Sequence, residues 1–179
     1  MQRAALSLKA KALSLIAQRE QSRLELRRKL LAHIDRLAST GGHPPAAANG
    51  SAVLDGSPSD PPDERQVDEL LDWLTTKDLL SAERFVETRV TARASRFGNL
   101  RIRQELAQHG LEVDEQTDTS LKASELPRAH AVWARRFGAP AADAAGRAKQ
   151  MRFLAARGFS AETVRRVVKG EGGENEEGE

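Results

Sequence analysis

One helical pattern occurs three times along this chain, and it limits the folds that the chain can adopt. Residues 93–111, RASRFGNLRIRQELAQHGL, combine the end of one helix, a Phe-Gly turn, an arginine-rich helix and a glycine stop. Residues 135–159 contain a second Phe-Gly turn and end in MRFLAARGF, and residues 19–34, REQSRLELRRKLLAHI, form a degenerate copy with a serine in the turn. Because so small a unit cannot bury its apolar face alone, the repetition predicts stacked units and an elongated shape.

The apolar residues favour helices throughout the chain. Leucine and alanine supply most of the apolar content, and β-branched residues never alternate with polar residues over the length of a strand. Stripes at helical spacing, such as Val67, Leu70, Leu71 and Leu74, predict nine helices in three units of three. We therefore predict an all-α fold, an elongated, curved array of three tandem three-helix units.

Composition divides the chain into five segments. A stretch rich in Gly, Pro, Ser and Ala predicts a flexible insertion or linker, and the Glu-rich end predicts a disordered acidic tail. The third unit is expected to open after Pro127. The predicted bounds are residues 1–37 with 63–80 for the first unit, 38–62 for the insertion, 81–126 for the second unit, 127–169 for the third unit and 170–179 for the tail.

Four residues are predicted to cap the N-termini of helices. Ser22 and Glu25 fit a capping box, in which the hydroxyl accepts from a backbone amide and the carboxylate reaches back to the Ser22 amide. Ser81, Asn99 and Ser160 fit simple caps.

The N-terminal segment, MQRAALSLKAKALSLIAQRE, is basic and contains no acid before Glu20. A transit peptide and a first packed helix can both have this composition, and the spacing of the apolar residues favours the packed helix. No apolar run approaches the ~20 residues that cross a bilayer, so we expect no membrane association. The absence of cysteine excludes disulfides and thiolate zinc sites and fits a reducing compartment, so we expect a cytoplasmic protein.

Positive charge is concentrated outside the tail. The formal charge of the whole chain is +2, but residues 171–179 carry five acids and no base, which leaves +7 on residues 1–170. Such a body should attract polyanions or an acidic protein surface. The acidic end could compete for this basic face or simply increase solubility.

Basic residues concentrate at the turn and on the second helix of each unit. If the units stack, these residues form one basic edge, which suits a long, periodic, negatively charged partner. The alternative is an ordinary solvent face whose arginines pair with Glu20, Glu25 and Glu105. The predicted basic edge consists of Arg19, Arg23, Arg27, Arg28, Lys29, Arg93, Arg96, Arg101, Arg103, Arg135, Arg136, Arg147, Lys149, Arg152 and Arg157.

Glycines and phenylalanines mark the turns. The predicted structural turn residues are Gly98, Gly110, Gly138 and Gly158. Gly110 and Gly158 are expected to end helices, Gly110 in the left-handed conformation, and Gly98 is a candidate for positive φ. Phe97 and Phe137 could stack on bases or pack their turns onto the protein's own core, and an aromatic residue beside a turn glycine more often does the latter.

The sequence gives no positive support for an enzyme. Its four histidines, His33, His43, His109 and His130, lack the spacing of metal ligands. No phosphate-cradling loop, dinucleotide fingerprint or nucleophile elbow is present. We therefore expect no catalytic residue, no metal and no cofactor, with a cryptic helical active site as the remaining alternative.

Residues 79–111 resemble the central repeat of the RecX family of recombinase regulators. The family pattern has a Leu-acidic-acidic-x-x-Phe start, an arginine-rich helix, a glycine turn and an Ile-x-x-Glu-Leu…Gly ending. The residues that match it are Arg84, Phe85, Arg93, Gly98, Arg103, Gln104, Glu105, Leu106 and Gly110. SRLELRRKLL at 22–31 is similar to the family's first motif, and residues 152–159 fit its third unit. Ser81 and Ala82 replace the usual acidic pair, and the 38–62 insertion is longer than expected.

The resemblance covers about residues 5–168 and implies a small, non-enzymatic, all-helical protein of three units. Such proteins bind the RecA–DNA filament, suppress its ATP hydrolysis and strand exchange, and favour its disassembly. The implied partners are the RecA recombinase filament and DNA, the implied roles are recombination, DNA repair and SOS regulation, and a monomer is expected. The arginines alone also allow a helical DNA-binding protein that acts without a recombinase.

Overall fold

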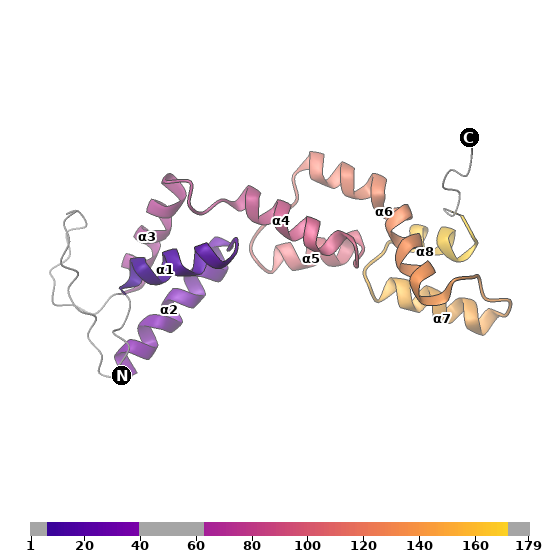
Figure 1. Ribbon diagram of the computed structural model, residues 1–179, viewed down its shortest axis with the longest axis horizontal. Coiled ribbons are helices and arrows are strands. Elements are labelled where there is room, and N and C mark those ends of the chain that lie inside the picture. Colours follow the sequence, from indigo (N-terminus) through magenta and orange to yellow (C-terminus); the bar gives the residue numbers. More distant parts are fainter. Residues whose placement is uncertain (1–6, 40–62, 172–179) are drawn as a thin grey trace. The chain divides into compact units, whose positions relative to one another are not determined.

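The computed structural model describes residues 7–39 and 63–171, and every regular element in these residues is a helix (Figure 1). The helices are α1 (Leu8–Gln18), α2 (Arg23–Ser39), α3 (Glu64–Thr76), α4 (Ala82–Ala94), α5 (Asn99–Ala107), α6 (Glu115–Phe137), α7 (Ala144–Ala155) and α8 (Ala161–Val168). The prediction of an all-α fold is confirmed. Most of the predicted insertion at 38–62 and most of the predicted tail at 170–179 lie outside the described residues.

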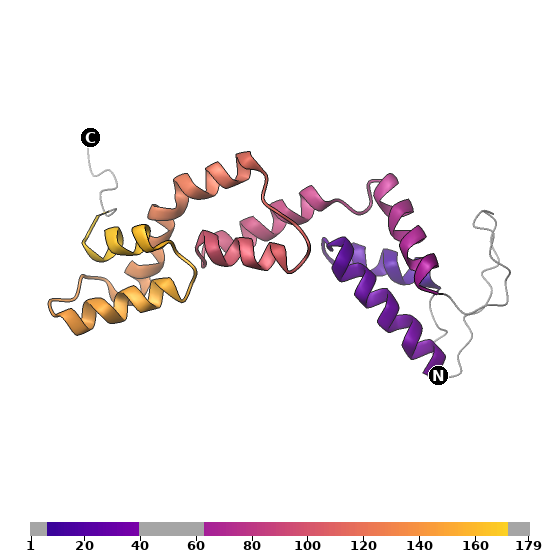
Figure 2. The same ribbon diagram turned by 180° about the vertical axis from the view of Figure 1, so that it is seen from behind.

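The chain forms two compact units, residues 1–85 and residues 86–179. In the first unit, α1 and α3 both pack against α2 (Figure 2). Its core contains Ala12, Leu26, Leu30, Val67, Leu70, Leu71, Leu74 and Leu80. The apolar stripe predicted on α3 is therefore the face that α3 buries.

The serine hydroxyls cap their helices as predicted. The hydroxyls of Ser22, Ser81 and Ser160 each accept a hydrogen bond from the backbone amide three residues later, at 3.1, 3.2 and 3.3 Å respectively. Each cap satisfies one of the backbone donors that a helix leaves unpaired at its start.

Helix α6 runs without a break through Pro127, where the sequence predicted two separate helices. The described residues therefore contain eight helices where nine were predicted, and the difference has a physical reason. Proline costs an interior helix about 3 kcal/mol, but residues on both sides of Pro127 are buried. Leu121, Ala129 and Trp133 are at most 3% exposed and continue one helical face across the proline. Figures 1 and 2 show α6 changing direction along its length, as expected at a proline.

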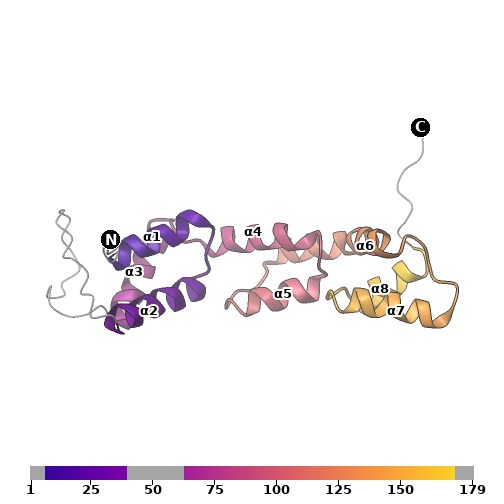
Figure 3. The ribbon, with the colours of Figure 1, turned by 60° about the horizontal axis from the view of Figure 1, so that its bottom comes forward.

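The second unit packs α7 and α8 against the C-terminal part of α6 (Figure 3). The core there contains Ala129, Val132, Trp133, Leu154, Phe159, Val164, Val167 and Val168. Phe137 is partly buried against this core and meets Phe153 edge-on, with the ring centroids 5.1 Å apart. For Phe137, the interpretation as a residue that packs onto its own core is confirmed.

Two glycines allow the start of α5 to touch the turn between α7 and α8. The Gly98 amide donates to the Arg157 carbonyl at 2.9 Å, and the Leu100 amide donates to the Gly158 carbonyl at 3.1 Å. A Cβ atom on Gly98 would lie 2.2 Å from the Phe159 backbone nitrogen. The φ of Gly98 is −79°, so the suggestion of positive φ is wrong, and glycine is needed here for close backbone approach.

The other three turn glycines have positive φ, as predicted for Gly110. The φ angles of Gly110, Gly138 and Gly158 are 69°, 73° and 80°. Each follows the end of a helix, where a residue with a side chain would be strained.

A buried carboxylate on α6 joins the starts of α5 and α8. Glu125 accepts hydrogen bonds from the Asn99 amide at 3.1 Å, from the Ser160 hydroxyl at 2.7 Å and from the Thr163 hydroxyl at 3.0 Å. The prediction that Asn99 caps α5 is wrong, because Gly98 occupies the N-cap position and Asn99 lies inside the helix. A carboxylate from another helix thus takes the place of the local cap.

Candidate polyanion-binding site

The excess of positive charge lies in residues 86–170, which are the second unit without the five acids of residues 171–179. Residues 1–85 contain 12 Lys or Arg and 12 Asp or Glu, whereas residues 86–170 contain 16 and 9, a formal charge of +7. Attraction towards a polyanion is therefore expected chiefly from residues 86–170.

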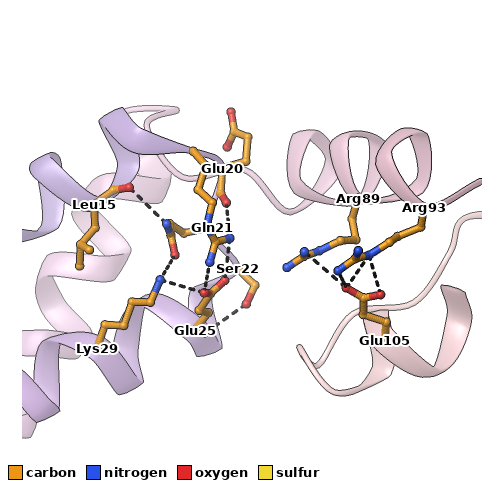
Figure 4. A network of polar contacts seen from close by, with 10 residues as sticks. Leu15, Glu20, Gln21, Ser22, Glu25, Lys29, Arg89, Arg93 and Glu105 are labelled. Atoms are coloured by element: carbon orange, nitrogen blue, oxygen red, sulfur yellow. Dashed lines mark hydrogen bonds and ion pairs between the residues drawn. The ribbon is translucent and has the colours of Figure 1, made fainter. Parts of the chain in front are cut away.

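In the first unit, most of the predicted basic residues bind acids of the protein itself. The ion pairs join Arg19 and Lys29 to Glu25, Arg23 to Asp72, and Arg27 to Asp68 and Glu64. Figure 4 shows Lys29 directed at Glu25 and at the Gln21 side chain, to which it donates at 2.8 Å. Only Arg28 of the five predicted residues in this unit is exposed without an ion pair to the described residues. The alternative interpretation, in which acids neutralise the arginines, therefore describes most of this cluster.

The pKa of Glu25 shows how strongly Arg19 and Lys29 stabilise its charged form in the folded protein. Burial raises the pKa of Glu25, but hydrogen bonds from Lys29 and Arg19, and their charges, outweigh burial and lower the pKa to about 2. The carboxylate is only 7% exposed, so its charge depends on these two partners.

Two predicted basic residues of the second unit are also paired. Arg93 binds both carboxylate oxygens of Glu105, at 3.0 and 3.1 Å (Figure 4), and Arg103 binds Asp118. The first pair joins α4 to α5 and the second joins α5 to α6. These arginines therefore stabilise helix packing, and their charge is largely compensated.

Four other predicted arginines surround one cavity, which we call the arginine pocket. Its volume is about 260 Å³, and it lies between the turn after α4, the end of α6, and α7 with the turn that follows it. Its lining residues are Ser95, Arg96, Val132, Arg135, Arg136, Phe153 and Arg157. Within residues 63–171, none of these arginines forms an ion pair with an acid. The pocket therefore concentrates positive charge that the described part of the protein leaves uncompensated.

Aromatic rings hold guanidinium groups in and beside the pocket. The Arg157 guanidinium lies 3.8 Å from the centroid of Phe153, close enough for a cation–π interaction. Around Phe97 the guanidiniums of Arg101 and Arg96 lie at 4.7 and 5.9 Å. Phe97 is half-buried and borders arginines, so its role differs from the core packing of Phe137.

The remaining predicted residues lie outside the pocket. Arg147, Lys149 and Arg152 are exposed on α7. The Arg147 guanidinium donates hydrogen bonds to the carbonyls of Ala141 and Ala142 and so holds the loop before α7 against the start of that helix. The structure therefore brings four of the fifteen predicted basic residues together in one cavity.

Sequence analysis missed the residue that supports one wall of the pocket. Arg128 on α6 donates to the carbonyls of Ala94 and Phe97, at 3.1 and 2.9 Å, and so fixes the turn that carries Arg96. Burial lowers the pKa of Arg128, whereas the charge of Glu125 raises it. A signal exists in the sequence: Glu125 and Arg128 follow the helical spacing of the buried face of α6, where a polar residue needs a partner.

Residues 7–39 and 63–171 contain no group of three acidic or histidine side chains that could hold a metal ion. Within the same residues no helix is both long and apolar enough to cross a membrane.

Comparison with known proteins identifies relatives along nearly the whole chain. Residues 124–168 match the third three-helix domain of the RecX family. The chain is 44% identical to the regulatory protein RecX of Ralstonia nicotianae, over 92% of this chain and 88% of that protein. It is 42% identical to the corresponding protein of Herbaspirillum seropedicae, over 92% and 91% of the two chains, and 32% identical to one from Neisseria meningitidis, over 91% and 90%. With such identity over nine tenths of its length, this chain belongs to the RecX family of regulatory proteins.

Proposed function

We propose that this protein binds the RecA–DNA filament and inhibits the recombinase's ATP hydrolysis and strand exchange. The observation that carries the proposal is the arginine pocket, whose four guanidiniums lack acid partners in the described residues, in a member of the RecX family. A filament wound around DNA presents the polyanion that such a surface suits.

Inhibition follows if binding holds neighbouring filament protomers in one arrangement. A ligand that binds one arrangement better than another shifts the protomers towards it, and ATP turnover and strand exchange both require changes between arrangements. In this proposal the protein acts as a monomer in the cytoplasm, without a cofactor or an activity of its own. Its roles are in recombination, DNA repair and SOS regulation. The predicted basic edge and domain bounds stay predictions.

The test is the DNA-dependent ATPase of the cognate recombinase, measured with the protein added below the recombinase concentration. We expect inhibition that grows with added protein and weakens as salt rises, because ionic contacts are screened. An unchanged rate, combined with no detectable binding to the filament at low salt, would contradict the proposal.

The second candidate is a helical DNA-binding protein that acts without a recombinase. The arginine pocket favours it equally, because unpaired guanidiniums recognise phosphate on bare DNA as well as DNA in a filament. Equal affinity for bare DNA and for the filament would support this candidate. A gain in affinity when the recombinase is present would exclude it.

A further inference from the structure

The arginine pocket has more hydrogen-bond donors than a carboxylate can use. Each guanidinium carries five N–H donors in a planar fork, so four of them present about twenty. A carboxylate offers two oxygens in one plane, whereas a phosphodiester offers two charged and two ester oxygens in a tetrahedral arrangement, and arginine binds either group bidentately. Donors that approach from three segments, at Arg96, Arg136 and Arg157, suit the tetrahedral group.

Charge repulsion among the arginines of the pocket also favours binding of an anion. Four positive groups around about 260 Å³ raise one another's energy when no anion is present, and a bound anion relieves this repulsion. The pocket is also partly organised before binding. The face of the Phe153 ring supports the Arg157 guanidinium, and Arg128 fixes the turn that bears Arg96.

The size of the pocket indicates which kind of phosphate it takes. Its volume lies below the range of about 300–1,000 Å³ that is typical of small-molecule sites. Arg157 already lies over a face of Phe153, so that face is not open to a nucleotide base. A phosphodiester with its neighbouring sugar fits these limits better than a free nucleotide whose base needs its own pocket.

We propose that the arginine pocket binds one backbone phosphate of a nucleic-acid strand. The proposal deepens the proposed function, because the DNA of the filament would supply the strand. Its test nevertheless uses nucleic acid alone, so that the two proposals can fail separately.

The experiment measures binding of a fluorescein-labelled oligothymidylate by fluorescence anisotropy. The pocket variant is Arg135→Ala with Arg136→Ala, and the matched control is Arg165→Ala with Lys169→Ala, which also removes two exposed positive charges from residues 86–170. We expect the pocket variant to raise Kd about tenfold or more, because a single charge-assisted hydrogen bond can contribute that much. The control should change Kd by less than about threefold, since it alters only the general field.

Circular dichroism confirms that each variant is folded, and Arg96→Ala provides a pocket variant on a different segment. Equal weakening by the pocket and control variants would overturn the proposal, because charge alone would then explain binding. Competition by polyglutamate as effective as that by unlabelled oligonucleotide of equal charge would overturn it as well, in favour of an acidic protein partner.

Two further outcomes separate the sources of phosphate and the two proposals. If ATP or inorganic pyrophosphate binds the wild type more tightly than the oligonucleotide, and the pocket variant loses that binding, a free nucleotide or phosphate replaces the strand as the ligand. The recombinase ATPase assay is run in parallel on the wild type. Its failure would remove the proposed filament function and leave the pocket assignment intact.

Discussion

The two compact units differ in how many of their basic side chains are neutralised by acids of the protein itself. In residues 1–85, basic side chains on and next to α2 are neutralised by acids, and the pairs of Arg23 and Arg27 bind α2 to α3. In residues 86–170, four arginines line one cavity without an acid partner in the described residues. The basic side chains of the first unit therefore contribute mainly to folding. The second unit uses Arg93 and Arg103 for helix packing and keeps four other arginines available for binding.

The second unit can leave these arginines uncompensated because other contacts hold its turns in place. The Gly98 amide and the Arg157 carbonyl join two turns through the backbone, and Glu125 and Arg128 fasten both turns to α6. None of these contacts uses an arginine side chain of the pocket. In the second unit, the residues that hold the turns in place are thus different from the arginines that line the pocket. In the first unit, Glu25 and its basic partners are both the charged groups and the groups that stabilise the packing.

The strongest test of this comparison is Gly98→Ala. The added Cβ would overlap the backbone at Gly158 and Phe159, which cannot move aside as a flexible side chain can. We expect a loss of about 3 kcal/mol or more in the free energy of unfolding, measured by urea denaturation. Gly110→Ala is the control, since its Cβ meets open space and only the positive φ costs about 1 kcal/mol. Equal losses would show that backbone contact does not hold the second unit together.

A smaller effect is expected from Glu25→Gln in the first unit. The substitution leaves Arg19 and Lys29 without their buried counter-charge, and we expect a loss of about 2 kcal/mol, reduced from the buried-pair range because Arg19 is half exposed. Urea denaturation of the wild type and the variant measures it. A change within about 0.5 kcal/mol would mean that the first unit, too, is stabilised independently of its charges.

The pH dependence of stability sharpens the same point. The folded-state pKa of Glu25 is lowered from 4.5 to about 2, so its contribution is complete above about pH 4.5 and is lost as the pH falls towards 2. Carboxyl carbon chemical shifts in an NMR titration should show Glu25 still ionised near pH 3. An ordinary titration midpoint near 4.5 would contradict the assigned network.

The smallest effects separate paired from pocket arginines. Arg27→Ala removes ion pairs with Asp68 and Glu64 and should destabilise the protein measurably, although the exposure of the side chain keeps the loss small. Arg136→Ala removes no ion pair within the described residues and should change the free energy of unfolding by less than about 0.5 kcal/mol. Thermal or urea denaturation of both variants compares them directly. If Arg136→Ala proves the more destabilising, the pocket arginines have a structural role.

Local chemistry explains why much of the fold could be predicted from the sequence. Serine caps, left-handed glycines and apolar stripes act over three or four residues, so Ser160, Gly110 and the face around Leu71 behave as their neighbours dictate. The continuity of α6 could not be predicted in this way. It depends on burial of residues on both sides of Pro127, which outweighs the local cost of proline.

The site was predictable only as a set of candidates. Charge and helical position identify Arg96, Arg136 and Arg157, but 61 residues separate the first from the last, and only the packing of α6 and α7 brings them to one cavity. Acid pairing also depends on tertiary contacts such as Arg103 with Asp118. Sequence spacing alone cannot distinguish a neutralised arginine from an available one.

Because α6 is one continuous helix, the number of residues in it fixes the rotation of the α7–α8 pair relative to the start of α5. One residue inserted or deleted between Glu125 and Trp133 would rotate the part of α6 beyond it by about 100°, and Ser160 and Thr163 would then no longer be in position to contact Glu125. Homologous proteins should therefore differ in the length of their loops while keeping the number of residues in this stretch unchanged.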